Sequence, residues 1–104
     1  MSTHKQLDID EIVKALAHPV RRDILTWLKT PQLYFADQDH PLEIGVCAGQ
    51  IDQRTGLSQS SVSAHLRTLQ QAGLISSKKV GQWHFFKRDE HTIRTFLDQL
   101  SKQL

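Results

Sequence analysis

The residues with the most distinctive chemistry form a run of short polar side chains at positions 58–67. Serine is a mediocre helix former, yet Val62, Leu66 and Leu69 recur at helical spacing and indicate a buried helix face. The side chains that can then contact base edges or phosphates are Gln59, Ser60, Ser61, Ser63, His65 and Arg67. Glutamine can pair with adenine and arginine with guanine, whereas serine mostly reaches phosphates. The run therefore predicts a helix that reads double-stranded DNA; the alternative is a capping Ser58 followed by serines that are only solvated.

The distribution of charge also indicates a nucleic-acid partner. The chain has 13 Lys and Arg against 11 Asp and Glu, a net charge of only +2. No acidic residue lies between Gln53 and Arg88, and that stretch carries Arg54, Arg67, Lys78, Lys79, Lys87 and Arg88. A positive block in a nearly neutral protein is typical of a surface that binds a phosphate backbone. A solvated basic face without a partner is the alternative.

The polar run is expected to be the second helix of a helix-turn-helix at about residues 48–72. Residues 48–55 can form a short helix that ends at Gly56, because glycine is favoured just after a helix. Ser58 is then a suitable N-cap for the second helix. In such a pair the second helix enters the major groove and presents its N-terminal residues to the bases.

A β-hairpin at about residues 74–87 follows and completes a winged helix-turn-helix. Its strands are expected at 74–79 and 82–87, with Gly81 in the turn. The candidate contacts of this wing with the DNA backbone or minor groove are Lys78, Lys79 and Gln82, and the alternative is a solvated turn. The aromatic residues of the second strand, assigned to the core and not to base stacking, are Trp83, Phe85 and Phe86.

The remaining residues predict a single domain over 1–104. Its fold class is mainly α with a small β-hairpin (α+β), in the order ααααββα. A first helix covers about residues 7–17, a second begins at Pro19, and a last helix covers about 89–103. Residues 30–46 are expected to be a loop. That loop is long for a compact domain, which favours a functional role for it.

The two terminal helices carry apolar residues that a partner could cover. A chain of 104 residues buries a modest fraction of its surface, and an uncovered apolar stripe indicates a partner surface. We therefore expect a homodimer through these helices, with an interface formed by Ile12, Leu16, Phe96, Leu97 and Leu100. Packing of the same stripe within one chain is the alternative.

Four fragments resemble the ArsR/SmtB family of bacterial transcriptional repressors. They are LAHPVRRDIL at 16–25, GLSQSSVSAHL at 56–66, AGLI at 72–75 and GQWHFF at 81–86, and the resemblance spans about residues 13–92. It implies homodimers whose terminal helices form the interface and which repress operons by binding imperfect palindromes. It also implies an effector that weakens DNA binding.

The metal-binding motifs of that family are incomplete in this chain. Cys47 matches the first cysteine of the family's Cys-Val-Cys motif, but Gly49 stands where the second is expected. Asp89 and His91 match half of a second zinc-type site, whose next position is Lys102, and a cation cannot ligate zinc. No metal site or cofactor is therefore predicted. The alternative is zinc or another divalent ion held by loop residues, namely Asp37, Asp39, His40 and Glu43, together with Cys47.

Cys47 is the candidate effector-sensing residue. The thiolate of a lone cysteine near a helix N-terminus is favoured, and it could respond to oxidants, reactive sulfur or electrophiles. A small buried residue without a sensing role is the alternative. The sequence leaves the identity of the effector open.

Other functional classes lack their motifs. No Gly-rich phosphate loop, nucleophile elbow or complete metal motif is present, so an enzyme is not expected. No apolar run is long enough to span a membrane, no secretory signal is expected, and a single cysteine indicates a reducing cytoplasm. We therefore predict a cytoplasmic, sequence-specific DNA-binding transcriptional regulator, in the first place a repressor released by an effector. The alternative is a winged-helix protein-interaction module that does not read DNA specifically.

Overall fold

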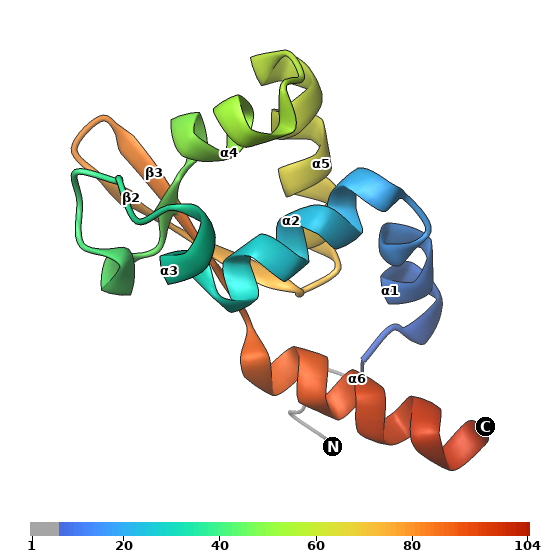
Figure 1. Cartoon of the computed structure of the whole chain (residues 1–104). Coiled ribbons are helices and arrows are strands. Elements are labelled where there is room, and N and C mark those ends of the chain that lie inside the picture. Colours follow the sequence, from blue (N-terminus) through green and yellow to red (C-terminus); the bar gives the residue numbers. More distant parts are fainter. Residues whose placement is uncertain (1–6) are drawn as a thin grey trace.

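The computed structural model describes residues 7–104, and its helices follow the expected order (Figure 1). Helix α1 (Ile9–Leu16) begins after Asp8, whose carboxylate accepts from the backbone N–H three residues on, at 3.0 Å. Helix α2 (Pro19–Lys29) begins after His18, whose Nδ1 accepts from the backbone N–H two residues on, at 3.2 Å. These caps satisfy N–H groups that have no partner inside a helix.

The expected loop over residues 30–46 is wrong in part, because the segment contains regular structure. A one-turn helix α3 (Pro31–Tyr34), a 3₁₀ turn η1 (Leu42–Ile44) and a short strand β1 (Val46–Cys47) lie within it or overlap its end. Strand β1 pairs antiparallel with the second strand of the hairpin. The sheet therefore has three strands, where the sequence predicted only two.

The amide of Gln38 holds this segment together. Its Nε2 donates to the carbonyls of His40 and Gly45 at 3.1 and 3.0 Å, and its Oε1 accepts from the Cys47 N–H at 2.8 Å. The side chain thus replaces the backbone partners that irregular segments lack. Sequence periodicity carries no signal for a contact of this kind.

Helices α4 (Ala48–Thr55) and α5 (Gln59–Gln71) form the expected helix-turn-helix. Gly56 between them has a φ of +70°, a conformation that favours glycine, and its N–H donates to the Asp52 carbonyl at 3.1 Å. Ser58 caps α5 as expected, because its Oγ accepts from the Ser61 N–H at 3.2 Å.

The wing consists of strands β2 (Ile75–Val80) and β3 (Trp83–Arg88), each beginning one residue later than expected. The sheet order is β1-β3-β2, and all pairs are antiparallel. Lys79 lies opposite His84, and Lys78 lies opposite Phe85. Because successive side chains of a strand point to opposite faces of a sheet, the two lysines lie on different faces of the wing.

The assignment of all three β3 aromatic residues to the core is wrong for Trp83. Phe85 and Phe86 are buried, but Trp83 is 44% exposed beside the hairpin turn. The His40 ring packs near both Trp83 and Phe85, with centroids 5.6 and 5.0 Å away. The segment before β1 therefore covers Phe85 on the sheet face that points away from α5, but it leaves Trp83, beside the hairpin turn, partly exposed.

Helix α6 (Glu90–Gln103) lies along the side of the molecule opposite the helix-turn-helix (Figure 1). Ile12 and Phe96, both expected at a dimer interface, are only 1% and 4% exposed and belong to the core of the same chain. Their α1 and α6 neighbours Val13 and Leu97 are exposed instead, Leu97 by 55%. The two buried side chains thus have almost no surface left for a partner.

No helix in the described part of the chain is long and apolar enough to cross a membrane.

Candidate nucleic-acid interface

The first turns of α5 present the polar side chains that the sequence selected. Gln59, Ser60, Ser61, Ser63 and Arg67 are all exposed, while the apolar face of the helix, Val62, Leu66 and Leu69, is buried. The Ser58 hydroxyl lies 2.9 Å from the Ser61 Oγ and 3.2 Å from the Ser60 Oγ. Short side chains at an exposed helix N-terminus allow a DNA backbone to approach closely.

His65 is the exception among the α5 candidates, because it faces inward. Its side chain is half-buried, and its ring centroid lies 4.4 Å from that of His18. Its Nδ1 lies 3.3 Å from the Nη1 of Arg21. Burial, and then the positive charges of His18 and Arg21, lowers the pKa of His65 below its ordinary value of 6.5. The ring therefore contacts the corner between α1 and α2, and the expectation that it reaches DNA does not agree with this placement.

The α5 side of the wing carries Lys79. The Gln70 side chain of α5 donates to the Ser77 Oγ at 2.9 Å, which fixes this face of β2 against the helix. Lys79 lies two residues further along the same face, opposite His84, and both are exposed. Gln82 is exposed in the hairpin turn. This face of the wing is therefore continuous with the exposed polar surface of α5.

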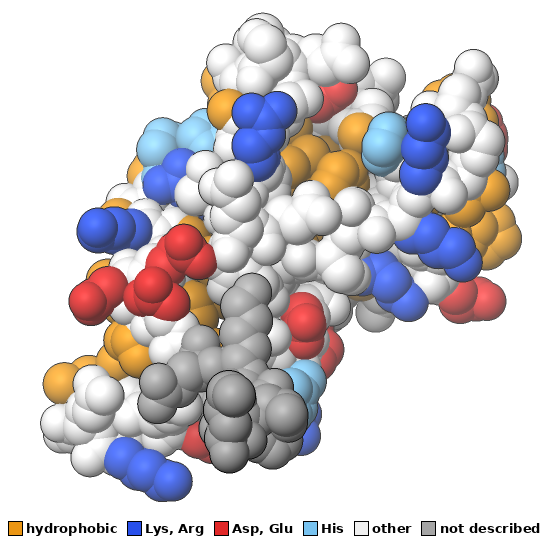
Figure 2. Space-filling model, turned by 180° about the vertical axis from the view of Figure 1, so that it is seen from behind, with side chains coloured by type: hydrophobic (Ala, Val, Ile, Leu, Met, Phe, Trp, Pro, Cys, Tyr) orange, Lys and Arg blue, Asp and Glu red, His pale blue; other side chains and the backbone are white. Residues whose placement is uncertain are grey.

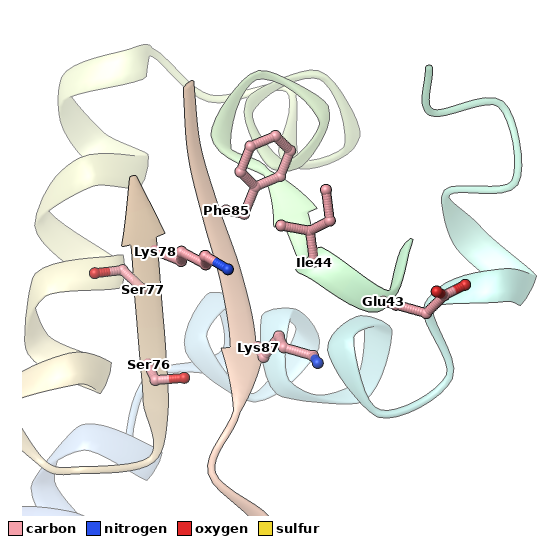
Figure 3. A pocket seen from close by; sticks show the side chains of 7 residues that line it. All are labelled: Glu43, Ile44, Ser76, Ser77, Lys78, Phe85 and Lys87. Atoms are coloured by element: carbon pink, nitrogen blue, oxygen red, sulfur yellow. The ribbon is translucent and has the colours of Figure 1, made fainter. Parts of the chain in front are cut away.

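The other face of the wing holds Lys78. With Ser76, Phe85 and Lys87 of the strands, and with Glu43 and Ile44 of the η1 turn, it lines a hollow of about 210 Å³. Figure 3 shows the Lys78 and Lys87 ammonium groups directed toward the η1 side, while the Ser77 hydroxyl points away from it. Lys78 thus lies apart from the surface that contains α5 and Lys79.

Two arginines of the acid-free stretch have partners within the chain, although Arg54 is exposed. The Arg54 guanidinium lies 4.6 Å from the ring centroid of Tyr34 and 5.4 Å from that of Trp27, so α4 is held against α2 and α3 by cation–π contacts. Arg88 forms a two-pronged ion pair with Glu90, at 2.9 and 3.0 Å. The sequence predicted both among the phosphate-binding charges. The aromatic partners of Arg54 lie on other helices, whereas Glu90 follows Arg88 by only two residues, and charge counting alone did not show that these two side chains pair.

The remaining charges still leave one positive side of the molecule. Figure 2, a view from behind, shows Lys, Arg and His side chains across the upper half of this face and most Asp and Glu side chains below them. The upper half corresponds to the helix-turn-helix and wing end of Figure 1. An exposed hydrogen-bonding helix beside a basic hairpin on one side is an arrangement suited to a DNA groove.

Comparison with known proteins agrees with this geometry. The model of the arsR family of bacterial regulatory proteins matches residues 46–77, from β1 into β2. Over 96 residues the chain is 38% identical to the uncharacterized HTH-type transcriptional regulator YbzH of Bacillus subtilis, covering 90% of this chain and 96% of that protein. The chain belongs to the ArsR family. This ArsR family protein is thus a transcriptional regulator, and the helix-turn-helix is its DNA-binding element.

Two further similarities support the family and its fold. The transcriptional repressor SdpR of Bacillus subtilis is 31% identical over 78 residues, which cover 75% of this chain and 72% of that protein. The solved structure of HlyU from Vibrio cholerae aligns with a TM-score of 0.63 at 26% identity, over 90% and 88% of the two chains. A crystallised ArsR family transcriptional regulator aligns with a TM-score of 0.71 at 18% identity, over 99% of this chain and 92% of that one, and shows the shared fold alone.

The candidate sensing residue of this ArsR family protein lies at the start of the helix-turn-helix. Cys47 is a free, half-buried cysteine at the N-cap position of α4, and its side chain forms no capping hydrogen bond. In residues 7–104 no three His, Cys, Asp or Glu side chains are grouped so that they could hold a metal ion. Asp89 instead caps α6, accepting from the Thr92 N–H at 3.0 Å, and the His40 ring packs on aromatic residues. The loop acids and Cys47 are therefore not brought together as a metal site.

Proposed function

We propose that this ArsR family protein is a sequence-specific repressor that binds an imperfect palindrome in double-stranded DNA. The observation that carries the proposal is the exposed polar face of α5, with Gln59 and Arg67 free of hydrogen-bond partners within residues 7–104, next to Lys79 of the wing. Gln and Arg are the side chains that read adenine and guanine in the major groove. The relative SdpR is a transcriptional repressor, which supports repression as the outcome of binding.

We further propose that the protein binds this DNA as a homodimer through α1 and α6. Val13 and Leu97 are exposed apolar residues of these helices, and Ile93 and Leu100 are half-buried beside them. Apolar groups of this kind are stabilised when a second surface covers them. A palindrome requires two copies of the reading helix, which a two-fold dimer supplies.

For release from DNA, we propose Cys47 as the sensing residue. Its thiol lies at the N-terminus of α4, so a chemical change there would act directly on the helix-turn-helix. Cys47→Ser protein should bind DNA and remain bound when treated with peroxide or persulfide. Release of the variant by the same treatment would eliminate the cysteine as the sensor.

The test of the proposed function is a binding titration with a palindromic fragment from the protein's own promoter. We expect tighter binding to this fragment than to random duplex of equal length, and a steep decrease in affinity with added salt. A transcription assay from the same promoter should show repression. Equal affinity for the two duplexes would instead favour a winged-helix module whose partner is a protein.

A further inference from the structure

One guanidinium joins the terminal helix α1 to the reading helix α5. The Arg21 Nε donates to the Ala15 carbonyl at 2.6 Å, and its Nη2 donates to the Lys14 carbonyl at 3.3 Å. Both carbonyls belong to the last turn of α1, where carbonyls lack partners inside the helix and a positive charge is favourable. The Nη1 of the same residue lies 3.3 Å from the Nδ1 of His65 on α5. Arg21 therefore connects two helices that do not follow each other in the chain.

This contact requires a neutral imidazole on His65. A guanidinium has only donors, so the His65 Nδ1 must accept and the ring proton must lie on Nε2. The same is true of His18, whose Nδ1 accepts from the Val20 N–H at 3.2 Å and caps α2. The two rings lie 4.4 Å apart. Protonation of either ring at Nδ1 would remove one acceptor and add a positive charge beside Arg21.

The charges that face His65 all oppose its protonation. They are Arg21 from α2 and, when it is protonated, His18 from the α1–α2 corner. In the described residues the only ion pair joins Arg88 to Glu90, so no carboxylate compensates this cluster. Burial and these neighbours lower the pKa of His65, which keeps the ring neutral at neutral pH. The His65 contribution to stability is then present above about pH 6.5 and is lost as the pH falls below that value.

We propose that Arg21 and His65 are positioning residues for DNA binding, and that their hydrogen bond, formed only while the histidine is neutral, makes DNA affinity fall in mildly acidic solution. The proposal rests on the proposed function for its DNA readout. We expect the His65 contact to hold the middle of α5 against the corner between α1 and α2, so that Ser63 and Arg67 on the exposed side of α5 stay oriented toward the DNA. Simple electrostatics predicts the opposite trend, because protonated histidines add positive charge and strengthen binding to phosphates.

The test compares DNA affinity at pH 7.5 and pH 5.5, at constant ionic strength, in wild-type and asparagine variants. The asparagine Oδ1 can take the place of the histidine Nδ1 as acceptor, it does not titrate, and asparagine is a good N-cap. We expect wild-type affinity to fall about tenfold once the His65 ring is protonated, the effect of removing one hydrogen bond to a charged group, and the NMR measurement below establishes how far the ring is protonated at the lower pH. The His18→Asn/His65→Asn double variant should lose little affinity at either pH. His91→Asn, which removes an exposed histidine from α6, should keep the wild-type fall.

A second measurement on the free protein separates this proposal from the proposed function. Nitrogen NMR at pH 7.5 should show a neutral His65 ring with its proton on Nε2. Acidification should shift the amide signals of residues 59–63 and 14–15 together in wild-type protein, and these shifts should be absent in the double variant. These shifts would establish the Arg21–His65 contact between α1 and α5 even if DNA binding proved to be non-specific.

Two results would overturn the proposal. The first applies when DNA binding is specific: the affinity of the wild-type protein rises on acidification, or the affinities of the wild-type protein and the double variant fall equally. The other is a His65 ring that carries its proton on Nδ1 at pH 7.5, because such a ring cannot accept from Arg21. Loss of DNA binding in Arg21→Ala alone would not count in favour, because that variant also loses its two hydrogen bonds with α1.

Discussion

The two ends of this molecule expose opposite kinds of surface. At one end, α5 and the wing present hydroxyl, amide and basic side chains, the apolar face of α5 is buried, and the exposed apolar residues Leu57, Val80 and Trp83 lie at or beside the turns. At the other end, α1 and α6 leave Val13 and Leu97 exposed although Ile12 and Phe96 are already buried. Exposed polar groups suit a hydrated, charged partner, and exposed apolar groups suit a protein surface. The difference indicates one end for DNA and one for a second copy of the chain.

The Arg21–His65 contact is the point where these ends meet. It links the last turn of α1 to the middle of α5 across the body of the molecule. Each end can still be disturbed separately by substituting its exposed side chains.

The largest effect is expected from Leu97→Lys at the apolar end. A charge at this exposed position should separate the proposed dimer without disturbing the core, and the loss of simultaneous binding to two half-sites should lower DNA affinity about 100-fold or more. Sedimentation measures the mass of the species, and anisotropy measures affinity. The matched control is Leu33→Lys, which places the same charge at a leucine of α3 that is 71% exposed. A Leu97→Lys protein that is still dimeric and binds normally would contradict an interface at α6.

The next effect concerns the polar end. Gln59→Ala with Arg67→Ala should lower affinity for the specific duplex by about 1–3 kcal/mol for each base that is no longer read, and should leave binding to random duplex much less affected. Both side chains are exposed, so the melting temperature should change little. Lys29→Ala with Gln32→Ala removes one positive charge and one amide from exposed positions elsewhere and serves as the control. Specific binding by the α5 double variant at the wild-type level would show that this helix does not read the bases.

The smallest effect compares the two faces of the wing. Lys79→Ala should reduce the slope of log affinity against log salt by about one, which is the signature of removing one ion pair with a phosphate. Lys78→Ala should leave this slope unchanged, because Lys78 lines the hollow on the opposite face. Slopes reduced equally in the two variants would mean that both lysines reach the DNA, and slopes unchanged in both would mean that neither does; either result would show that strand alternation does not separate their roles.

The sequence alone determined the elements whose signals are local. Gly56 and Ser58 marked the turn and the cap of the helix-turn-helix, and the spacing of Val62, Leu66 and Leu69 defined the buried side of α5 and so its exposed polar side. These features depend on backbone conformation and on helical period, which neighbouring residues specify. The family resemblance followed from the same fragments and was confirmed by the relatives.

Only the tertiary structure decided which of the side chains predicted to bind DNA have partners within the protein. It turned His65 inward against His18 and Arg21, and it engaged Arg54 with Trp27 and Tyr34. It also paired β1 with β3 in the sheet. Each of these contacts joins residues from different elements, and their partners become neighbours only when the elements pack. A sequence pattern can assign a side chain to a face of its own helix, but the other helices determine whether that face meets solvent, DNA or the rest of the protein.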